Sequence, residues 1–183
     1  AANKSARAMV VETYRTLPKI PNRRRGGPDH VELIVDMYTL LRTDAAPSDE
    51  SLRNIAERAR ATGSPLDRYA RVHAVIVLTI LGEHMLASDL CEAADTPSAI
   101  VGAPSAHLAD FMLYRGLCAL LRSQTGFERR RGKRIARRCQ RRLDVWARYG
   151  PDFVHMSRFL AAERARARGD GRNALRLYPE AAK

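Results

Sequence analysis

The chain has 183 residues, of which 45% are hydrophobic and 28% charged, and this length is sufficient for one domain with its own core. Its net charge is +12, and 28 of its 32 basic residues are arginine, a bias typical of GC-rich genomes, so codon usage explains part of the charge. No apolar run approaches the ~20 residues that span a bilayer, and the first residues contain no signal segment. Composition therefore excludes a membrane-spanning protein and favours a cytoplasmic one, in which Cys91, Cys118 and Cys139 are reduced and buried.

Residues 1–27 are expected to form an appendage, with a helix over 3–16 followed by a basic linker rich in Pro and Gly. The chain starts at Ala1 rather than Met, which we interpret as a sign that it is part of a longer protein. Residues 28–183 are expected to form one helical repeat domain.

The first half of this domain predicts four helices. Asp29 and Glu32 form a capping-box pattern before a helix over 31–41, and Ser48 caps a second helix that ends at Gly63. The apolar positions of that second helix are Leu52, Ile55, Ala56 and Ala59. Ser64 and Pro65 start a third helix that runs to Gly82, although its segment 75–80 resembles a buried strand when taken alone. A short helix then reaches Ala94.

The second half continues with helices after a loop over 95–104. Ser105 caps a helix whose predicted core face holds Leu108, Phe111, Met112, Leu117, Leu120 and Leu121, and Gly126 ends it. A basic helix follows over 127–149, then another over 152–168, and Gly169-Asp170 turns into the last. No segment alternates between apolar and polar residues as a half-buried strand would.

Two segments 87 positions apart share one spacing of small residues, with Gly followed by Ala five residues later and again seven beyond. These are Gly82, Ala87 and Ala94, and Gly169, Ala174 and Ala181. Glycine suits the tight reversal between two helices, and alanine lets the helices approach closely. The spacing is typical of tetratricopeptide-like (TPR-like) hairpins and predicts an all-α, irregular stack of antiparallel helical hairpins, an α-α superhelix.

A resemblance to a known group of proteins covers residues 60–183. It rests on scattered residues, namely Ser64-Pro65, Gly82-Glu83, Ala87, Phe111, Tyr114, Gly116-Leu117, Leu143, Trp146-Ala147, Pro151, Phe153, His155, 162–166, Gly169-Asp170, Ala174-Leu175, Leu177-Tyr178 and Ala181. These resemble the TPR-like helical region of large multidomain signalling proteins. In those proteins a Ser/Thr-kinase-like domain and an AAA-type ATPase domain precede the region, and GAF and sensor histidine kinase domains often follow it. The resemblance implies a kinase or ATPase parent, of which this segment holds no catalytic part.

Motifs for catalysis are missing. The sequence has no GxxxxGK[ST] phosphate loop, GxGxxG, HExxH, GxSxG or HRD element, so we expect no enzyme activity, cofactor or metal. The histidines are dispersed, at positions 30, 73, 84, 107 and 155. His73 and His84 flank one hairpin, and His155 is expected in a buried hydrogen bond or at a helix start. The carboxylates of Asp89, Glu92 and Asp95 are expected on a solvated face, and Glu163 is expected to pair with Arg166.

The basic helix carries the one concentrated feature. At about 100° per residue, an arginine ridge lies on one side, formed by Arg130, Arg134, Arg137, Arg138, Arg141 and Arg142. The opposite side holds Ile135, Cys139, Leu143 and Trp146, which predicts a buried tryptophan. The ridge is either an ordinary solvated face or a docking surface for acidic protein, nucleic acid or anionic lipid. The solvated face is preferred, and among partners an acidic protein comes before nucleic acid.

The expected function is a non-catalytic regulatory or scaffolding module of a multidomain signal-transduction kinase or ATPase. It would contact a protein partner or neighbouring domains of the same chain, with weak binding of polyanions. One alternative is a nucleic-acid-binding helical domain of a transcription regulator. Another is a helical sensor of small molecules, which the apolar helices 65–81 and 105–122 suggest.

Overall fold

The computed structural model describes residues 29–42, 46–61, 67–93, 106–122 and 126–182. Over these ranges every regular element is a helix and no strand occurs, which confirms the all-α class. The chain divides into two compact units, residues 1–93 (unit 1) and 94–183 (unit 2), so the expected repeat domain 28–183 spans both. The expected helix over 3–16, the linker and the loop over 95–104 lie outside the described residues.

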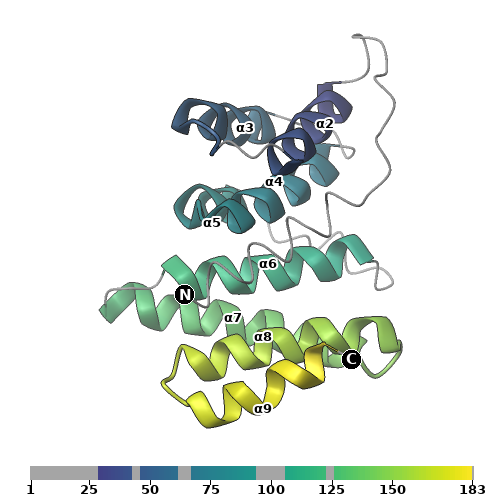
Figure 1. The fold of residues 1–183 in the computed structure, drawn as a ribbon, viewed down its shortest axis with the longest axis vertical. Coiled ribbons are helices and arrows are strands. Elements are labelled where there is room, and N and C mark those ends of the chain that lie inside the picture. Colours follow the sequence, from purple (N-terminus) through teal and green to yellow (C-terminus); the bar gives the residue numbers. More distant parts are fainter. Residues whose placement is uncertain (1–28, 43–45, 62–66, 94–105, 123–125, 183) are drawn as a thin grey trace. The chain divides into compact units, whose positions relative to one another are not determined.

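Unit 1 is built around one buried helix. It contains α2 (Asp29–Arg42), α3 (Asp49–Ala61), α4 (Asp67–Leu81) and α5 (His84–Ala93), and α4 contacts the other three (Figure 1). Residues 74–79 of α4 are all buried. The run 75–80, which resembles a strand in sequence, is therefore part of a helix. Its apolar residues point in several directions because α2, α3 and α5 all pack against α4.

Helix α3 follows its predicted pattern closely. The Oγ of Ser48 accepts a hydrogen bond from the backbone N–H of Ser51 at 3.2 Å, so the predicted N-cap is confirmed. The buried residues of α3 are the four that were expected, Leu52, Ile55, Ala56 and Ala59. Asp49 and Glu50 lie in its first turn, where the helix dipole favours negative charge.

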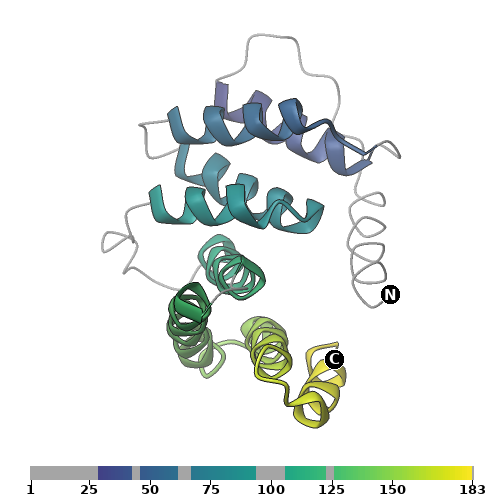
Figure 2. The same ribbon diagram turned by 90° about the vertical axis from the view of Figure 1, so that its left-hand side faces the viewer.

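Unit 2 packs four helices and one short 3-10 turn. These are α6 (Ala106–Arg122), α7 (Gly126–Trp146), η2 (Pro151–Phe153), α8 (Val154–Arg166) and α9 (Gly171–Ala181). Helix α6 contacts both α7 and α8, and α8 contacts α9; Figure 2 shows these helices nearly end-on. A Cβ added at Gly116 of α6 would lie 2.8 Å from Cδ2 of Leu160, so glycine permits the close approach of α6 and α8.

The core face of α6 differs in part from the prediction. Leu108, Phe111 and Leu117 are buried as expected, whereas Met112, Leu120 and Leu121 are only half-buried. Leu113 and the small residues Ala109, Gly116, Cys118 and Ala119 are buried instead. The reason is that α6 packs against two helices, so its buried arc is wider than the stripe that a single partner would need.

Both predicted hairpin turns close with the same hydrogen bonds. Gly82 (φ 94°) and Gly169 (φ 83°) lie in the left-handed region that glycine tolerates best. In the first turn, Glu83 N–H donates to the Leu78 carbonyl at 2.8 Å and Gly82 N–H to that of Thr79 at 3.2 Å. In the second, Asp170 N–H donates to Ala165 and Gly169 N–H to Arg166, both at 3.0 Å. Each turn is a complete Schellman motif.

Small residues sit inside both hairpins. Ala87 of α5 is fully buried, and Ala174 of α9 is 3% exposed, as the repeated spacing predicts. Ala181 is half-buried, and Ala94 lies outside the described residues. None of the helices in the described part of the chain is long and apolar enough to cross a membrane.

Candidate polyanion-binding surface

Helix α7 separates an arginine face from a buried face, as the sequence predicts. Arg130, Arg134, Arg137, Arg138 and Arg141 are exposed. On the opposite side, Cys139, Leu143 and Trp146 are buried, and Ile135 is half-buried. The sixth ridge residue, Arg142, is half-buried, with its guanidinium 5.2 Å from the centre of the Trp146 ring. Trp146 also packs against Phe153 of η2, at 6.2 Å between ring centres.

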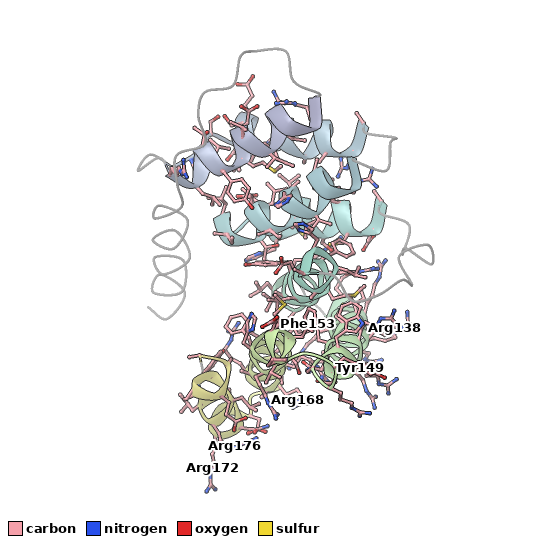
Figure 3. The ribbon with its side chains drawn as sticks, turned by 90° about the vertical axis from the view of Figure 1, so that its right-hand side faces the viewer. Arg138, Tyr149, Phe153, Arg168, Arg172 and Arg176 are labelled. Atoms are coloured by element: carbon pink, nitrogen blue, oxygen red, sulfur yellow. The ribbon has the colours of Figure 1, made fainter. Side chains whose placement is uncertain are left out.

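Arg164 of α8 and Arg168 of the turn after α8 extend the ridge across the helix pair. Burial lowers the pKa of Arg164 most, and the nearby charges of Arg168, Arg137 and Arg141 lower it further, while Asp144 opposes them. Arg164 therefore lies within electrostatic range of ridge residues that are more than 20 positions away in sequence. Figure 3 shows Arg138 and Arg168 extending away from the ribbon. We define the arginine surface as Arg134, Arg137, Arg138 and Arg141 of α7, Arg164 of α8, and Arg168 of the turn after α8.

The arginine surface lacks carboxylate partners among the described residues, since none of its six guanidinium groups forms an ion pair with one. Arginines elsewhere do so, namely Arg58 with Asp36, Arg60 with Asp89, Arg158 and Arg176 with Glu180, and Arg166 with Glu163. The last of these is the predicted i,i+3 pair, at 2.7 Å. Six like charges that form no ion pairs with the described carboxylates outweigh the nearby charge of Asp144, and such a positive surface favours the binding of an anion.

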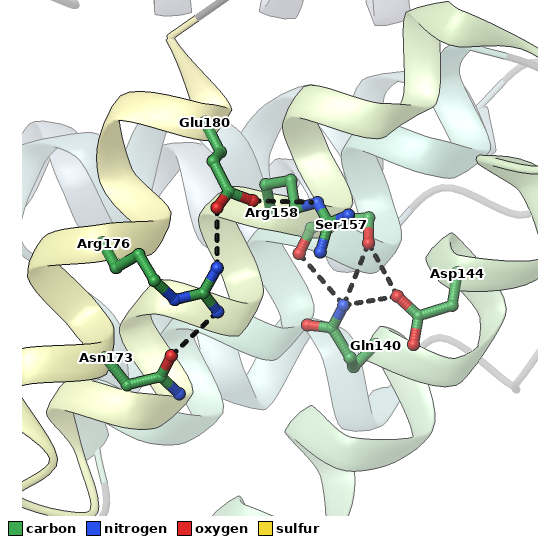
Figure 4. Close-up of polar contacts among 7 residues, drawn as sticks. All are labelled: Gln140, Asp144, Ser157, Arg158, Asn173, Arg176 and Glu180. Atoms are coloured by element: carbon green, nitrogen blue, oxygen red, sulfur yellow. Dashed lines mark hydrogen bonds and ion pairs between the residues drawn. The ribbon is translucent and has the colours of Figure 1, made fainter.

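The nearest carboxylate is engaged in a polar network between α7 and α8 (Figure 4). The Oδ1 atom of Asp144 accepts hydrogen bonds from Gln140 Nε2 at 2.7 Å and from Ser157 Oγ at 2.6 Å. Gln140, 5% exposed, also directs Nε2 at the Ser157 carbonyl at 3.0 Å. These bonds fix the rotation of α7 against α8, and with it the residues that α7 presents outward.

The positive charge of the whole chain is concentrated in unit 2. Residues 1–93 contain 13 Lys and Arg against 12 Asp and Glu, whereas residues 94–183 contain 19 against 8. Unit 2 therefore carries +11 of the net charge of +12. Codon usage acts on both units alike, so it does not explain a surplus of positive charge that is confined to unit 2.

The histidines do not gather into a site. The hydroxyl of Tyr38 is hydrogen-bonded to Nδ1 of His73 at 3.0 Å. Nδ1 of His84 is buried and has no hydrogen-bond partner among the described residues, and burial lowers the pKa of His84. His155 is exposed in the first turn of α8, which agrees with the predicted helix start but not with the predicted buried bond. Within the described ranges, no three His, Cys, Asp or Glu side chains are placed to hold a metal ion.

The remaining reactive groups are isolated or buried. All three cysteines are buried, as expected, and no disulfide joins them; burial raises the pKa of Cys139 to about 11. A thiol of that pKa is protonated at neutral pH and is a poor nucleophile. Asp89 lies 3.7 Å from Arg60, Glu92 is exposed, and Asp95 is outside the described residues.

Sequence patterns alone did not reveal the contribution of α8 to the surface. Arg164 and Arg168 are four residues apart, a spacing that places them on one face of the expected helix over 152–168, although α8 ends at Arg166. What was missing was the rotation of α8 against α7, which Gln140 and Ser157 determine.

Comparisons with known proteins return no relative. No protein-family model matches the chain, and no curated protein or solved structure is significantly similar to it. The resemblance of residues 60–183 to the helical region of large signalling proteins therefore stays a prediction. What the chain binds has to be inferred from its own residues.

Proposed function

We propose that this chain is a non-catalytic helical interaction module whose contact surface is the arginine surface of unit 2. The observation that carries the proposal is a group of six arginines on two packed helices and the turn after the second, none of them paired with a carboxylate of the described residues. A solvated face of ordinary composition would carry charges of both signs, as α3 does.

In the parent protein, the module would serve as a regulatory or scaffolding part of a multidomain signalling kinase or ATPase. Two observations support a TPR-like form. The hairpins α4–α5 and α8–α9 close with the same Schellman turn, and a buried alanine follows each turn at the same spacing. Stacked hairpins of this kind present extended surfaces to their partners.

A non-catalytic role is consistent with the side chains that could otherwise react. The sequence has no phosphate-binding loop, and the thiols of the three cysteines are buried. In the described part of the chain no histidine belongs to a metal-binding group, and His73 is hydrogen-bonded to Tyr38.

Nucleic-acid binding is a second candidate function, and the separation of charge between the units favours it. Lysine and arginine surplus confined to one unit is the electrostatic footprint of proteins that bind nucleic acid. In this case the arginine surface would contact phosphates rather than carboxylates.

The proposed contact surface can be tested by two variants of equal net charge. The first replaces Arg134, Arg138 and Arg141 of α7 by glutamine, and the second replaces Arg53, Arg58 and Arg60 of α3. Both lower the net charge by the same amount. On immobilised heparin, a generic polyanion, we expect the α7 variant to elute at clearly lower salt than the wild type, and the α3 variant to elute close to it.

Circular dichroism should show that both variants remain helical, because all six side chains lie at helix positions with little or partial burial. Equal elution of the two variants would contradict the proposal, since it would mean that overall charge governs binding. The Arg58–Asp36 and Arg60–Asp89 pairs are surface contacts that contribute about 0–1 kcal/mol each, so their loss should not unfold unit 1.

A further inference from the structure

We propose that the ligand of the arginine surface is a single-stranded nucleic acid, whose phosphates contact the arginines of α7 and α8 and one of whose bases stacks on Tyr149. This inference rests on the proposed function, because it names the partner of the same surface. It differs from the expected acidic protein partner, and three features of unit 2 favour it.

The first feature is the regular spacing of the arginines. Arg134, Arg138 and Arg141 follow each other by about one helical turn on α7, so their side chains repeat every ~5 Å along the axis. Arg164 near the end of α8 and Arg168 in the turn that follows add two more guanidinium groups. A phosphodiester chain is a ligand of regularly repeating negative charge, and the planar guanidinium fork binds phosphate oxygens in pairs.

The second feature is the lack of an apolar centre between these arginines. The cores of protein–protein interfaces are apolar and depleted of charge, whereas protein–nucleic acid interfaces are more positively charged. From Arg130 to Arg141, every exposed residue of α7 is an arginine, and the positions between them are half-buried or buried. Such a surface lacks the exposed apolar centre that is typical of protein–protein interfaces.

The third feature is an exposed aromatic ring at the end of the arginine row. Tyr149 lies in the turn that ends α7 and is 80% exposed, the highest value among the exposed large hydrophobic residues of the described chain. Val145, 42% exposed, continues the surface between Arg141 and Tyr149. The neighbouring rings of Trp146 and Phe153 pack on each other, and no such ring contact involves Tyr149 in the described residues.

An exposed tyrosine next to a basic row is the arrangement with which proteins bind single strands. Bases of a single strand are free to stack on an aromatic ring, whereas the faces of bases in a duplex are covered by their neighbours. Figure 3 shows Arg138 and Tyr149 on the same side of unit 2 in that view. Tyr149 thus favours a single strand over a duplex.

The experiment measures the binding of three fluorescent probes by anisotropy over a range of salt concentrations. The probes are a single-stranded oligothymidylate, a duplex of the same length, and a glutamate-rich peptide. We expect the single strand to bind most tightly. Glutamine at Arg134, Arg138 and Arg141 should make the log–log salt slope for the single strand shallower by about 2, because each lost phosphate contact contributes about 0.7. The matched variant of Arg53, Arg58 and Arg60 should leave the slope unchanged.

Variants of Tyr149 test the stacking contact separately. Tyr149→Leu should weaken single-strand binding about 5- to 100-fold without changing the salt slope, whereas Tyr149→Phe, which keeps the ring, should bind like the wild type. Both substitutions lie at an exposed position, so the fold should be unaffected.

The outcomes separate this inference from the proposed function. Equal binding of duplex and single strand with no effect of Tyr149→Leu would overturn the single-strand inference. Tighter binding of the acidic peptide, lost in the α7 variant, would overturn nucleic acid as the ligand and leave the contact surface in place. If the α7 variant changes the binding of no probe, the proposed contact surface itself is wrong.

Discussion

Unit 1 and unit 2 each contain a helical hairpin closed by the same Schellman turn, yet their charges differ sharply. Unit 1 is nearly neutral, with 13 basic and 12 acidic residues, whereas unit 2 has 19 and 8. In unit 1, two arginines of α3 pair with carboxylates, while the arginine surface of unit 2 has no such pairs among the described residues. The fold of a hairpin thus depends on a few turn residues, and its surface chemistry can change independently of them.

The largest effect is expected in the core of unit 2. Trp146→Ala should lower the free energy of unfolding by ~3–5 kcal/mol, because the ring is 3% exposed and packs against Phe153 and Arg142. Denaturant unfolding followed by far-UV circular dichroism measures this loss. Tyr149→Ala, three residues away but exposed, is the control and should stay within ~0.5 kcal/mol of the wild type. An unfolding midpoint unaffected by Trp146→Ala would show that the buried face of α7 is wrongly assigned.

The two turn glycines should respond equally to substitution. Gly82→Ala and Gly169→Ala should each cost about 1–2 kcal/mol, because φ is 94° and 83° and an L-residue is strained there. A Cβ added at either position meets no atom within 4 Å, so the cost comes from the backbone alone. Thermal unfolding of both variants provides the measurement. A cost at only one of them would break the equivalence of the two hairpins.

The residue after each glycine should distinguish the hairpins. The Oδ1 atom of Asp170 accepts from the backbone N–H of Asn173 at 3.1 Å and so caps α9. Asp170→Ala should therefore cost ~1 kcal/mol. Glu83→Ala, at the equivalent place in unit 1, should cost less than ~0.5 kcal/mol, because glutamate is not a favoured N-cap residue. Equal losses, measured by denaturant unfolding, would imply that Glu83 also caps its helix.

The smallest effects concern pH, and the two units should respond with opposite sign. Burial lowers the pKa of His84 in unit 1 below 6.5, so the unfolded chain binds its proton more readily. The stability that depends on neutral His84 should be lost as pH falls through about 6.5. His84→Gln should remove this part of the pH dependence in thermal unfolding between neutral and mildly acidic pH.

Asp110 in unit 2 behaves in the opposite way. Burial raises its pKa above 3.8, against the lowering effect of His107 and His155, so the folded state holds the proton more tightly. The stabilising contribution of protonated Asp110 is present below pH 3.8 and is lost as pH rises through the higher pKa of Asp110 in the folded state. Asp110→Asn should therefore unfold at a higher temperature than the wild type at neutral pH, and the gain should shrink towards pH 3.8. A gain that is independent of pH would point to a cause other than titration.

Local signals predicted several parts of the fold. Ser48 and the apolar spacing of α3 identified its cap and its four buried residues, and Gly82 and Gly169 identified two turns. The helix through the run 75–80 was predictable because a start signal precedes it and the segment from that signal to Gly82 is longer than a typical strand.

The parts that depend on packing between helices were not predictable from local signals. The wider buried arc of α6 arises from its contacts with both α7 and α8, which place Gly116 next to Leu160. The Gln140–Ser157 contact joins residues 17 positions apart and orients the helices that carry Arg137 and Arg164. The exposed ridge of α7 was predicted, but its extension onto α8 required the structure.

The way in which the helices contact one another has a consequence for how the chain folds during synthesis. Each extensive helix contact in the described residues joins elements that are neighbours or next neighbours in sequence, such as α4 with α5 and α6 with α8. Proteins dominated by such local contacts fold in microseconds to milliseconds, and units that emerge first from the ribosome fold first. The nearly neutral unit 1 can thus complete its core before the arginines of α7 emerge from the ribosome, itself a large polyanion.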